Sequence, residues 1–540
     1  MSRLQLSIPF SAKALARIAV HLPVLLVFGF AVRVAWQGID FGQHWDEHII
    51  ILAMQRSLRS GLFLPQRYNY PSVPFYLPYF ALASDAFALW WADVSLPKAV
   101  QALVGVVQSH WFLLSCRRLF SALVLSSILW VYVLIYAWRR VWWEALLGAA
   151  ILGLSFELGY HARWVAPDGV MMQFGALTMA LLVVSRQALP GAPGSYLTAA
   201  AIAAGLTCGS KYPGGILLLP VLLAPLLDPR LRAKPWIAGL TVVKLGALFA
   251  LAYLFTTPAT LVDAFAFREQ LDAVARVYKE EGHAGYTVIA GAPHFAKLLT
   301  YLGRVALSPF TSVAAVFAMA AAVGAVLLLM RERAMAVLLV GVPVLYVSYF
   351  SQTRVMIVRN LLILFPFLAV LAAYGLAESA RAIATLAERR LPPAVVRAVL
   401  AVTLTSPLLF GAAYLQRAQA TIQQRRQVDP IAALAGYLDQ HPEERFGLSP
   451  DARRRLHAYD EKVRPNVVDE PSPETMVAVF PREISNWMWR LPANDLGSYR
   501  LLPTGPLDVS WDYYPSWMDA NRLIFMRAAI AKNMGLKVTP

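Results

Sequence analysis

Long apolar runs dominate the first 415 residues and restrict the fold of this chain more than any other feature. About eleven of these runs approach the roughly 20 residues that an α-helix needs to cross the hydrocarbon core of a bilayer. Hydrophobic residues make up 58% of the chain and charged residues only 15%, whereas soluble domains are about half apolar and about a quarter charged. Lipid must therefore be the solvent for much of this surface, and the sequence predicts a polytopic α-helical membrane protein.

The first apolar run is separated from the others by a long polar and aromatic segment, about residues 37–117. This segment contains one apolar piece, 74–93, that Pro78 and Asp85 interrupt, so we expect interfacial or re-entrant helices there instead of a span. The predicted spans are about residues 18–36, 119–138, 142–160, 169–185, 196–210, 213–227, 236–257, 305–330, 334–350, 359–379 and 395–414.

The distribution of basic residues orients these spans. Arg3, Lys13 and Arg17 precede the first span and place the N-terminus in the cytoplasm, because loops on the cytoplasmic side are enriched in lysine and arginine. Every loop then predicted to be inside is basic: Arg139, Arg140, Arg186, Arg230, Arg232, Lys234, Arg331, Arg333, Arg381, Arg389, Arg390 and Arg397. The composition indicates a bacterial inner membrane, with the C-terminus and the segment 37–117 in the periplasm.

The net charge of +16 has its source in these short clusters. A nucleic-acid-binding protein needs one continuous basic face, so the pattern argues against nucleic acid as a partner and favours membrane lipids. Cys116 and Cys208 both lie in apolar runs far apart, so no disulfide framework is expected.

The character of the chain changes near residue 415. We predict a transmembrane domain over 1–415 and a periplasmic C-terminal domain over 416–540, which is polar, rich in proline and of mixed α/β type. Within it, Met476–Phe480 is typical of a strand, and Leu523–Met534 is predicted to form a terminal helix.

An acidic pair follows the first span, in the segment His44-Trp45-Asp46-Glu47-His48. A carboxylate beside low-dielectric lipid has a raised pKa and suits a general base, so Asp46 and Glu47 are candidate catalytic residues. A solvated loop in which Asp46 caps a helix is the simpler alternative. Tyr68 and Tyr70 lie further along the same segment, and their hydroxyls are candidate substrate contacts. His48 is a third.

Charged residues also occur at other loops predicted to be outside. Asp168 opens the fourth span just after Arg163, and Lys211 with Tyr212 lies between two short spans. Arg354 and Arg359 lie between the ninth and tenth spans, and two arginines on this side depart from the charge rule. A helix cap at Asp168 and lipid headgroups at the arginines are the alternatives. A cation between spans needs a partner, and an anionic lipid phosphate supplies one.

In their order and spacing these motifs resemble the GT-C membrane glycosyltransferases, and within them the protein O-mannosyltransferase and lipid A aminoarabinose transferase group. The resemblance covers about residues 15–380. It implies transfer of a sugar from a polyprenyl-phosphate carrier to an acceptor hydroxyl on the periplasmic or lumenal face, which for a bacterial inner membrane is the periplasmic one. It also implies that Asp46 acts as base or orients the acceptor, with Glu47 as its partner. Asp168 is then the second acid, and Lys211, with Arg354 and Arg359 more loosely, lies near the donor phosphate.

The sequence departs from that group at Tyr68-Asn69-Tyr70-Pro71, where the aminoarabinose transferases have Glu-Lys-Pro-Pro. That glutamate helps to hold a metal in those relatives, so the cofactor stays open. A divalent metal ion bound by His44, His48 and His283 is one alternative. The identity of the sugar also stays open, and the acceptor is a lipid, a glycan or a protein.

Two other functions compete with this hypothesis. A lipid-linked sugar flippase or transporter would bury polar groups at the bilayer midplane and often shows internal repeats, neither of which the sequence indicates. A zinc metalloprotease would use the spacing His44-x-x-Glu47-His48, with the histidines as ligands and the glutamate as base. That short pattern arises often by chance and leaves Arg163, Asp168 and Lys211 unexplained.

Overall fold

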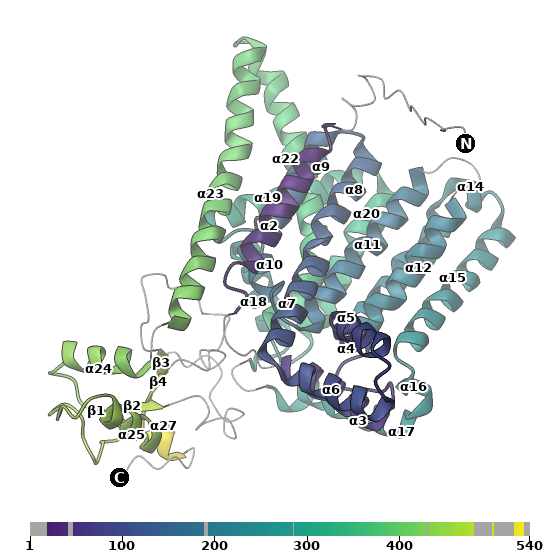
Figure 1. Cartoon of the computed structure of the whole chain (residues 1–540). Coiled ribbons are helices and arrows are strands. Elements are labelled where there is room, and N and C mark those ends of the chain that lie inside the picture. The colour runs from purple at the N-terminus through teal and green to yellow at the C-terminus, as the bar shows by residue number, and fades with distance from the viewer. Residues whose placement is uncertain are drawn as a thin grey trace, which may run out of the picture.

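The computed structural model describes residues 19–40, 47–187, 193–283, 286–427, 430–479, 499–501 and 523–533. Long helices run side by side in a bundle, and a small sheet with short helices lies near the C-terminus (Figure 1). This arrangement confirms the predicted fold class, a polytopic helical membrane protein with a small mixed α/β part.

Every predicted span corresponds to a helical segment. The helices of the bundle are α2 (Leu22–Trp36), α7 (His110–Leu125), α8 (Ser127–Arg139), α9 (Trp142–Gly153), α11 (Pro167–Gln187), α12 (Pro193–Ser210), α13 (Leu218–Leu227), α15 (Pro235–Thr256), α19 (Thr311–Arg331), α20 (Arg333–Leu339), α21 (Gly341–Ser351), α22 (Phe365–Ala387) and α23 (Pro393–Gln427). In the part of the chain that the structure describes, 7 helical segments are long and apolar enough to cross a membrane, and three apolar segments are shorter.

Shorter helices connect the spans. They are α3 (Glu47–Ser60), α4 (Val73–Ala81), α5 (Ala83–Trp91), α6 (Leu96–Gln108), α10 (Phe156–His161), α14 (Pro229–Arg232), α16 (Ala259–Val262), α17 (Ala264–Arg276) and α18 (Ala292–Arg304), with η1 (Tyr212–Leu217), η2 (Val277–Glu281) and η3 (Val358–Leu364). The apolar piece 74–93 is divided into α4 and α5. With 9 residues each, these helices are about 14 Å long and cannot cross a bilayer.

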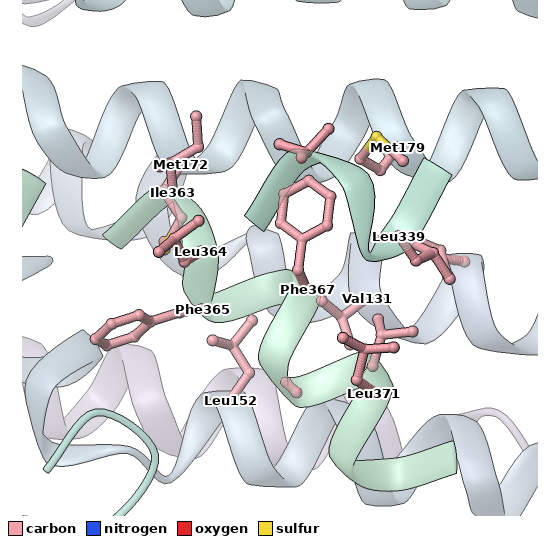
Figure 2. Packing of buried hydrophobic residues seen from close by; sticks show 14 of the residues in the cluster. Val131, Leu152, Met172, Met179, Leu339, Ile363, Leu364, Phe365, Phe367 and Leu371 are labelled. Atoms are coloured by element: carbon pink, nitrogen blue, oxygen red, sulfur yellow. The ribbon is translucent and has the colours of Figure 1, made fainter. Parts of the chain in front are cut away.

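The centre of the bundle is α22, which lies between α8, α9, α11 and α19. Its apolar side chains, such as Phe367 and Leu371, interdigitate with Val131 of α8 and Met179 of α11 (Figure 2). In the segment Val358–Ala387, 89% of the most apolar 18-residue stretch is buried. The corresponding stretches of α15 and of Pro393–Arg417 are only 11% buried. The last two therefore form the lipid-facing rim.

Two glycines allow α19 and α22 to approach closely. A Cβ atom on Gly375 would collide with the backbone oxygen of Ala320, and one on Gly324 would collide with the backbone oxygen of Leu371. Small residues at such contacts let transmembrane helices pack backbone to backbone.

Gly375→Ala should destabilise the bundle by about 1–3 kcal/mol, because the added methyl group meets backbone that cannot move aside. The measurement is the thermal unfolding midpoint in detergent. Gly239→Ala in α15 is the matched control, since its Cβ would meet nothing within 4 Å. Equal midpoints for the two variants would contradict the close approach.

The C-terminal part contains a 4-stranded sheet in the order β1-β2-β4-β3. The strands are β1 (Phe446–Leu448), β2 (Met476–Val479), β3 (Tyr499–Leu501) and β4 (Ile524–Arg527), and the helices are α24 (Pro430–Gln440), α25 (Pro450–Tyr459) and α27 (Ala528–Asn533). Strand β1 is parallel to β2, and β4 is antiparallel to both β2 and β3. Phe446, Leu434 and Phe525 are central to its core.

One expectation for this region is wrong. The segment 523–534 was predicted to form one helix, but its first half is strand β4 and only Ala528–Asn533 is helical. The reason is tertiary: β4 pairs on both edges, with β2 and with β3, and this pairing outweighs local preference. The strand predicted at 476–480 is present as β2. The domain boundary near residue 415 stays a prediction.

Candidate functional site

Lys211 is the centre of a buried polar cluster. It lies in extended conformation between the end of α12 and the start of η1, so the chain breaks its helix there. Its Nζ lies 2.5 Å from Oδ1 of Asp168 and also donates to the side-chain oxygen of Asn360. The lysine side chain is 8% exposed. A buried ammonium needs such partners, because desolvation is otherwise costly.

Asp168 links two cations in this cluster. It is the second residue of α11, where a carboxylate interacts favourably with the helix dipole. While its Oδ1 accepts from Lys211, its Oδ2 lies 3.5 Å from Nε of Arg359 in η3. Two cationic side chains thus share one carboxylate, and this group of three is attractive to an anion.

Asn360 is a functional candidate that the sequence analysis missed. Its side-chain amide accepts from Lys211 and donates to the Tyr278 hydroxyl at 3.1 Å. Its backbone oxygen accepts from the Tyr346 hydroxyl at 2.6 Å. An uncharged asparagine in an apolar run carries no sequence signal of this role, although it adjoins Arg359.

The two candidate tyrosines of the segment 37–117 have different surroundings. The Tyr70 ring lies near Lys211, whose Nζ is 5.8 Å from the ring centroid. In contrast, the Tyr68 side chain is buried and its hydroxyl donates to Asp263 at 2.6 Å. Burial and this carboxylate raise the pKa of Tyr68. The Tyr212 hydroxyl donates to the backbone oxygen of Tyr68 at 2.8 Å. The hydrogen bonds of Tyr68 and Tyr212 therefore attach this segment to the bundle.

Glu47 forms a bidentate ion pair with Arg117 of α7. The distances are 2.8 Å from Nε to Oε1 and 2.5 Å from the second guanidinium nitrogen to Oε2. The carboxylate also accepts from the backbone N–H of Val165 at 3.2 Å, and Arg117 donates to the backbone oxygen of Ile39. This clamp fixes the start of α3 against the turn that leads to Asp168.

The remaining residues of the acidic segment are less informative. Asp46 and His44 lie outside the described residues. His48 is exposed on α3. The engagement of the Glu47 carboxylate with a guanidinium favours a positioning role for it, because a general base must reach a reacting proton.

Arg163 is fully buried in the turn between α10 and α11, with its guanidinium 5.5 Å from the centroid of the Tyr160 ring. Burial, with repulsion from nearby Arg117, lowers the pKa of Arg163 to about 10, so the side chain stays charged at neutral pH. One turn earlier, Glu157 accepts from the Tyr301 hydroxyl at 2.5 Å. His161 Nε2 lies 3.8 Å from the same carboxylate.

Arg354 lies in a different environment from Arg359. Its guanidinium donates to the backbone oxygen of Glu280 at 2.5 Å, and its backbone N–H donates to that of Tyr278. The neighbouring Val355 forms a β-bridge with Thr287. Arg354 therefore secures the loop after α17, whereas Arg359 joins the Lys211 cluster.

Part of the chain that contains this site matches a known protein family. Residues 114–261 match the family model of Dolichyl-phosphate-mannose-protein mannosyltransferase. The match confirms the predicted resemblance to the GT-C membrane glycosyltransferases. It spans Arg117, Arg163, Asp168 and Lys211, and it supports a glycosyltransferase activity.

Solved structures of GT-C enzymes are also similar. ArnT from Cupriavidus metallidurans, bound to undecaprenyl phosphate, shares 14% identity over 93% of this chain and 97% of that chain, with a TM-score of 0.45. The archaeal oligosaccharyltransferase AglB from Archaeoglobus fulgidus, in complex with an inhibitory peptide and a dolichol-phosphate, shares 13% identity over 85% of this chain and 61% of that chain, with a TM-score of 0.47. No curated protein matches the sequence significantly.

The GT-C resemblance raised the question of a metal ion. Among the residues with described positions, no group of three or more histidine, cysteine, aspartate or glutamate side chains could hold one. His283 packs its ring against Tyr286 at 5.5 Å between centroids. A site that includes His44 or Asp46 falls on residues that the structure does not describe, so the metal ion stays an open alternative.

Arg117→Met should destabilise the protein by about 3–5 kcal/mol, because it leaves the buried Glu47 carboxylate without its counter-charge. The thermal unfolding midpoint in detergent is the measurement. Arg118→Met is the matched control, since the Arg118 guanidinium lies over Trp111 on the half-buried side of α7. Arg117→Met/Glu47→Met should recover much of the loss, and a midpoint unchanged in Arg117→Met would disprove the clamp.

Proposed function

We propose that this protein transfers a sugar from a polyprenyl-phosphate-linked donor to an acceptor hydroxyl on the periplasmic face of the membrane. One observation carries the proposal: Lys211 is buried between Asp168 and Asn360, with Arg359 on the same carboxylate. The charge pattern of the loops supports a position of this cluster at the outer ends of the spans. A carrier lipid would hold its phosphate at that depth while its tail stays in the bilayer.

The chemistry follows from the charge that develops during transfer. The acceptor oxygen attacks the anomeric carbon as its proton moves to the base, for which we propose Asp46. The bond between that carbon and the phosphate oxygen breaks, and the carrier leaves as a phosphate with one further negative charge. Lys211 and Arg359 would stabilise this charge, because cations in a water-poor site act strongly on developing anions.

The other side chains prepare the site. Asp168 and Asn360 hold the Lys211 ammonium in place, so it need not reorganise when the carrier phosphate arrives. Glu47 is bound to Arg117 and to the backbone of Val165, so we propose that it positions the start of α3. We propose substrate contacts for Tyr70 and Arg163, and supporting roles for Tyr68, Tyr212 and Arg354.

Native mass spectrometry of the gently extracted protein tests this function. We expect a bound polyprenyl phosphate, and any attached sugar would identify the donor by its mass. The lipid should be lost in Lys211→Met and retained in Lys279→Met, in the exposed turn after α17. Stoichiometric zinc without such a lipid would favour the metalloprotease, although Glu47 is engaged by Arg117 and is poorly placed as its base.

A flippase would bind the same lipid, so activity must separate it from a transferase. Asp46→Asn should abolish sugar transfer but leave carrier translocation unchanged if the base assignment is right. Carrier translocation by the wild-type protein without any sugar transfer would support the flippase.

The proposed orientation predicts that a tag after Pro540 is digested by protease added from the periplasmic side. The reason is that in this orientation every cytoplasmic loop is basic, whereas the opposite orientation would put these basic loops in the periplasm. Digestion of tagged protein in spheroplasts, followed by immunoblotting, is the measurement. A tag after Met1 serves as the control and should be protected, and the reverse result would invert the topology.

A further inference from the structure

Helix α15 lies at the edge of the bundle, where it packs against α12 and α13 (Figure 1). Its other side is exposed, because only 11% of its most apolar 18-residue stretch is buried. Exposed residues recur there every three or four positions and form one stripe, which we call the α15 stripe: Ile237, Leu240, Lys244, Ala247, Leu251 and Phe255. This spacing places the six side chains on one face of the helix.

Lys244 is the unusual member of the α15 stripe. It is the tenth of 22 residues, so it lies about 14 Å from one end of the helix and about 18 Å from the other. This is close to the bilayer midplane. The side chain is exposed and makes no hydrogen bond or ion pair with any residue whose position the structure describes.

A lysine at this depth is costly in lipid, and charged residues within membrane spans usually have a partner. Snorkelling relieves the cost for lysines near helix ends, but from the middle of α15 the path to either interface is long. The exposed stripe of α19 differs, because its residues Val316, Met319, Val323 and Val326 are all apolar. Lys244 therefore distinguishes the exposed face of α15 from that of α19.

Among the residues that the structure describes, the acids within the long spans are already paired. Within the 7 long spans that the structure describes, the acids are Asp168 and Glu378. Asp168 is bound to Lys211 and Arg359, and Glu378 is bound to Arg139, Arg331 and Arg381. A symmetric pairing of two copies through α15 would bring the two Lys244 side chains together, which is repulsive.

We propose that the α15 stripe docks a transmembrane helix of a different membrane protein, one that carries an aspartate or glutamate near the bilayer midplane. The apolar residues of the stripe supply packing on both sides of Lys244. The ion pair between lysine and acid sets the register, as a single polar residue does in a helical seam. The stripe is exposed whereas Lys211 is buried, so the partner could be held against α15 without contacting the Lys211 cluster.

Photo-crosslinking of the full-length protein in cells tests this surface. Benzoylphenylalanine placed at Leu240 should give one discrete crosslinked protein whose span contains an acid, while the same probe at Met319 of α19 should not. Lys244→Leu should lower the yield at Leu240 at least tenfold, and Lys244→Arg should retain it. Leucine suits a lipid-facing helix, so loss of folding would not explain the change.

A charge swap completes the test. Lys244→Glu combined with a lysine in place of the partner's acid should restore the crosslink that either change alone removes. Crosslinks to lipid only, to a second copy of this chain, or to a protein without an intramembrane acid would overturn the proposal. So would a yield that Lys244→Leu leaves unchanged.

Discussion

Lys211→Met is expected to lower kcat/KM for the lipid-linked donor by about 10²–10³, the loss seen when one group that stabilises a developing anion is removed. In the wild type the ammonium is held by Asp168 and Asn360 in a site with little water, so its charge is poorly screened. Methionine keeps the length and the packing but removes the charge. Steady-state kinetics with purified donor, in detergent or nanodiscs, provides the measurement.

Stability must be separated from function in this variant, because it leaves Asp168 with only Arg359 as cationic partner among the described residues. Lys211→Met/Asp168→Asn removes the uncompensated carboxylate and should restore the unfolding midpoint while activity stays low. Lys211→Arg keeps the charge and should retain more activity than Lys211→Met. A donor KM and a kcat that both stay at wild-type values in Lys211→Met would contradict the proposed role of Lys211 at the donor phosphate.

Asp46→Asn should reduce turnover by about 10²–10⁴, the usual contribution of a general base, because a carboxamide cannot take up the acceptor proton. The protein should insert and unfold as the wild type does. The clamp between Glu47 and Arg117 belongs to the structure and is untouched by this change. Single-turnover transfer with saturating donor and acceptor isolates the chemical step.

Two variants serve as controls for Asp46→Asn. Asp85→Asn, on α5 of the same segment 37–117, removes a carboxylate far along the chain and should leave turnover unchanged. Glu47→Gln weakens the clamp, so it should lower both stability and turnover, in contrast to Asp46→Asn. Normal turnover in Asp46→Asn would remove the base assignment.

The sequence determined the membrane helices because lipid leaves the backbone little choice. Without water to satisfy N–H and C=O groups, each apolar run of sufficient length must form a helix, so even the short runs at 142–160 and 213–227 are helical. The candidate residues Tyr70, Asp168, Lys211 and Arg359 were recognisable for a related reason. Charged and polar groups beside apolar runs are costly and need a partner.

Only the tertiary structure decided which partners these residues have. Asn360 carries no charge, and nothing local shows that its amide meets Lys211, 149 positions away. Glu47 and Tyr68 looked equivalent to Asp46 and Tyr70 in the sequence, yet Arg117 and Asp263 engage them. Strand β4 likewise depends on β2 and β3. Hydrogen bonds and ion pairs act over about 3 Å, and only the packed chain brings residues so distant in sequence within that range.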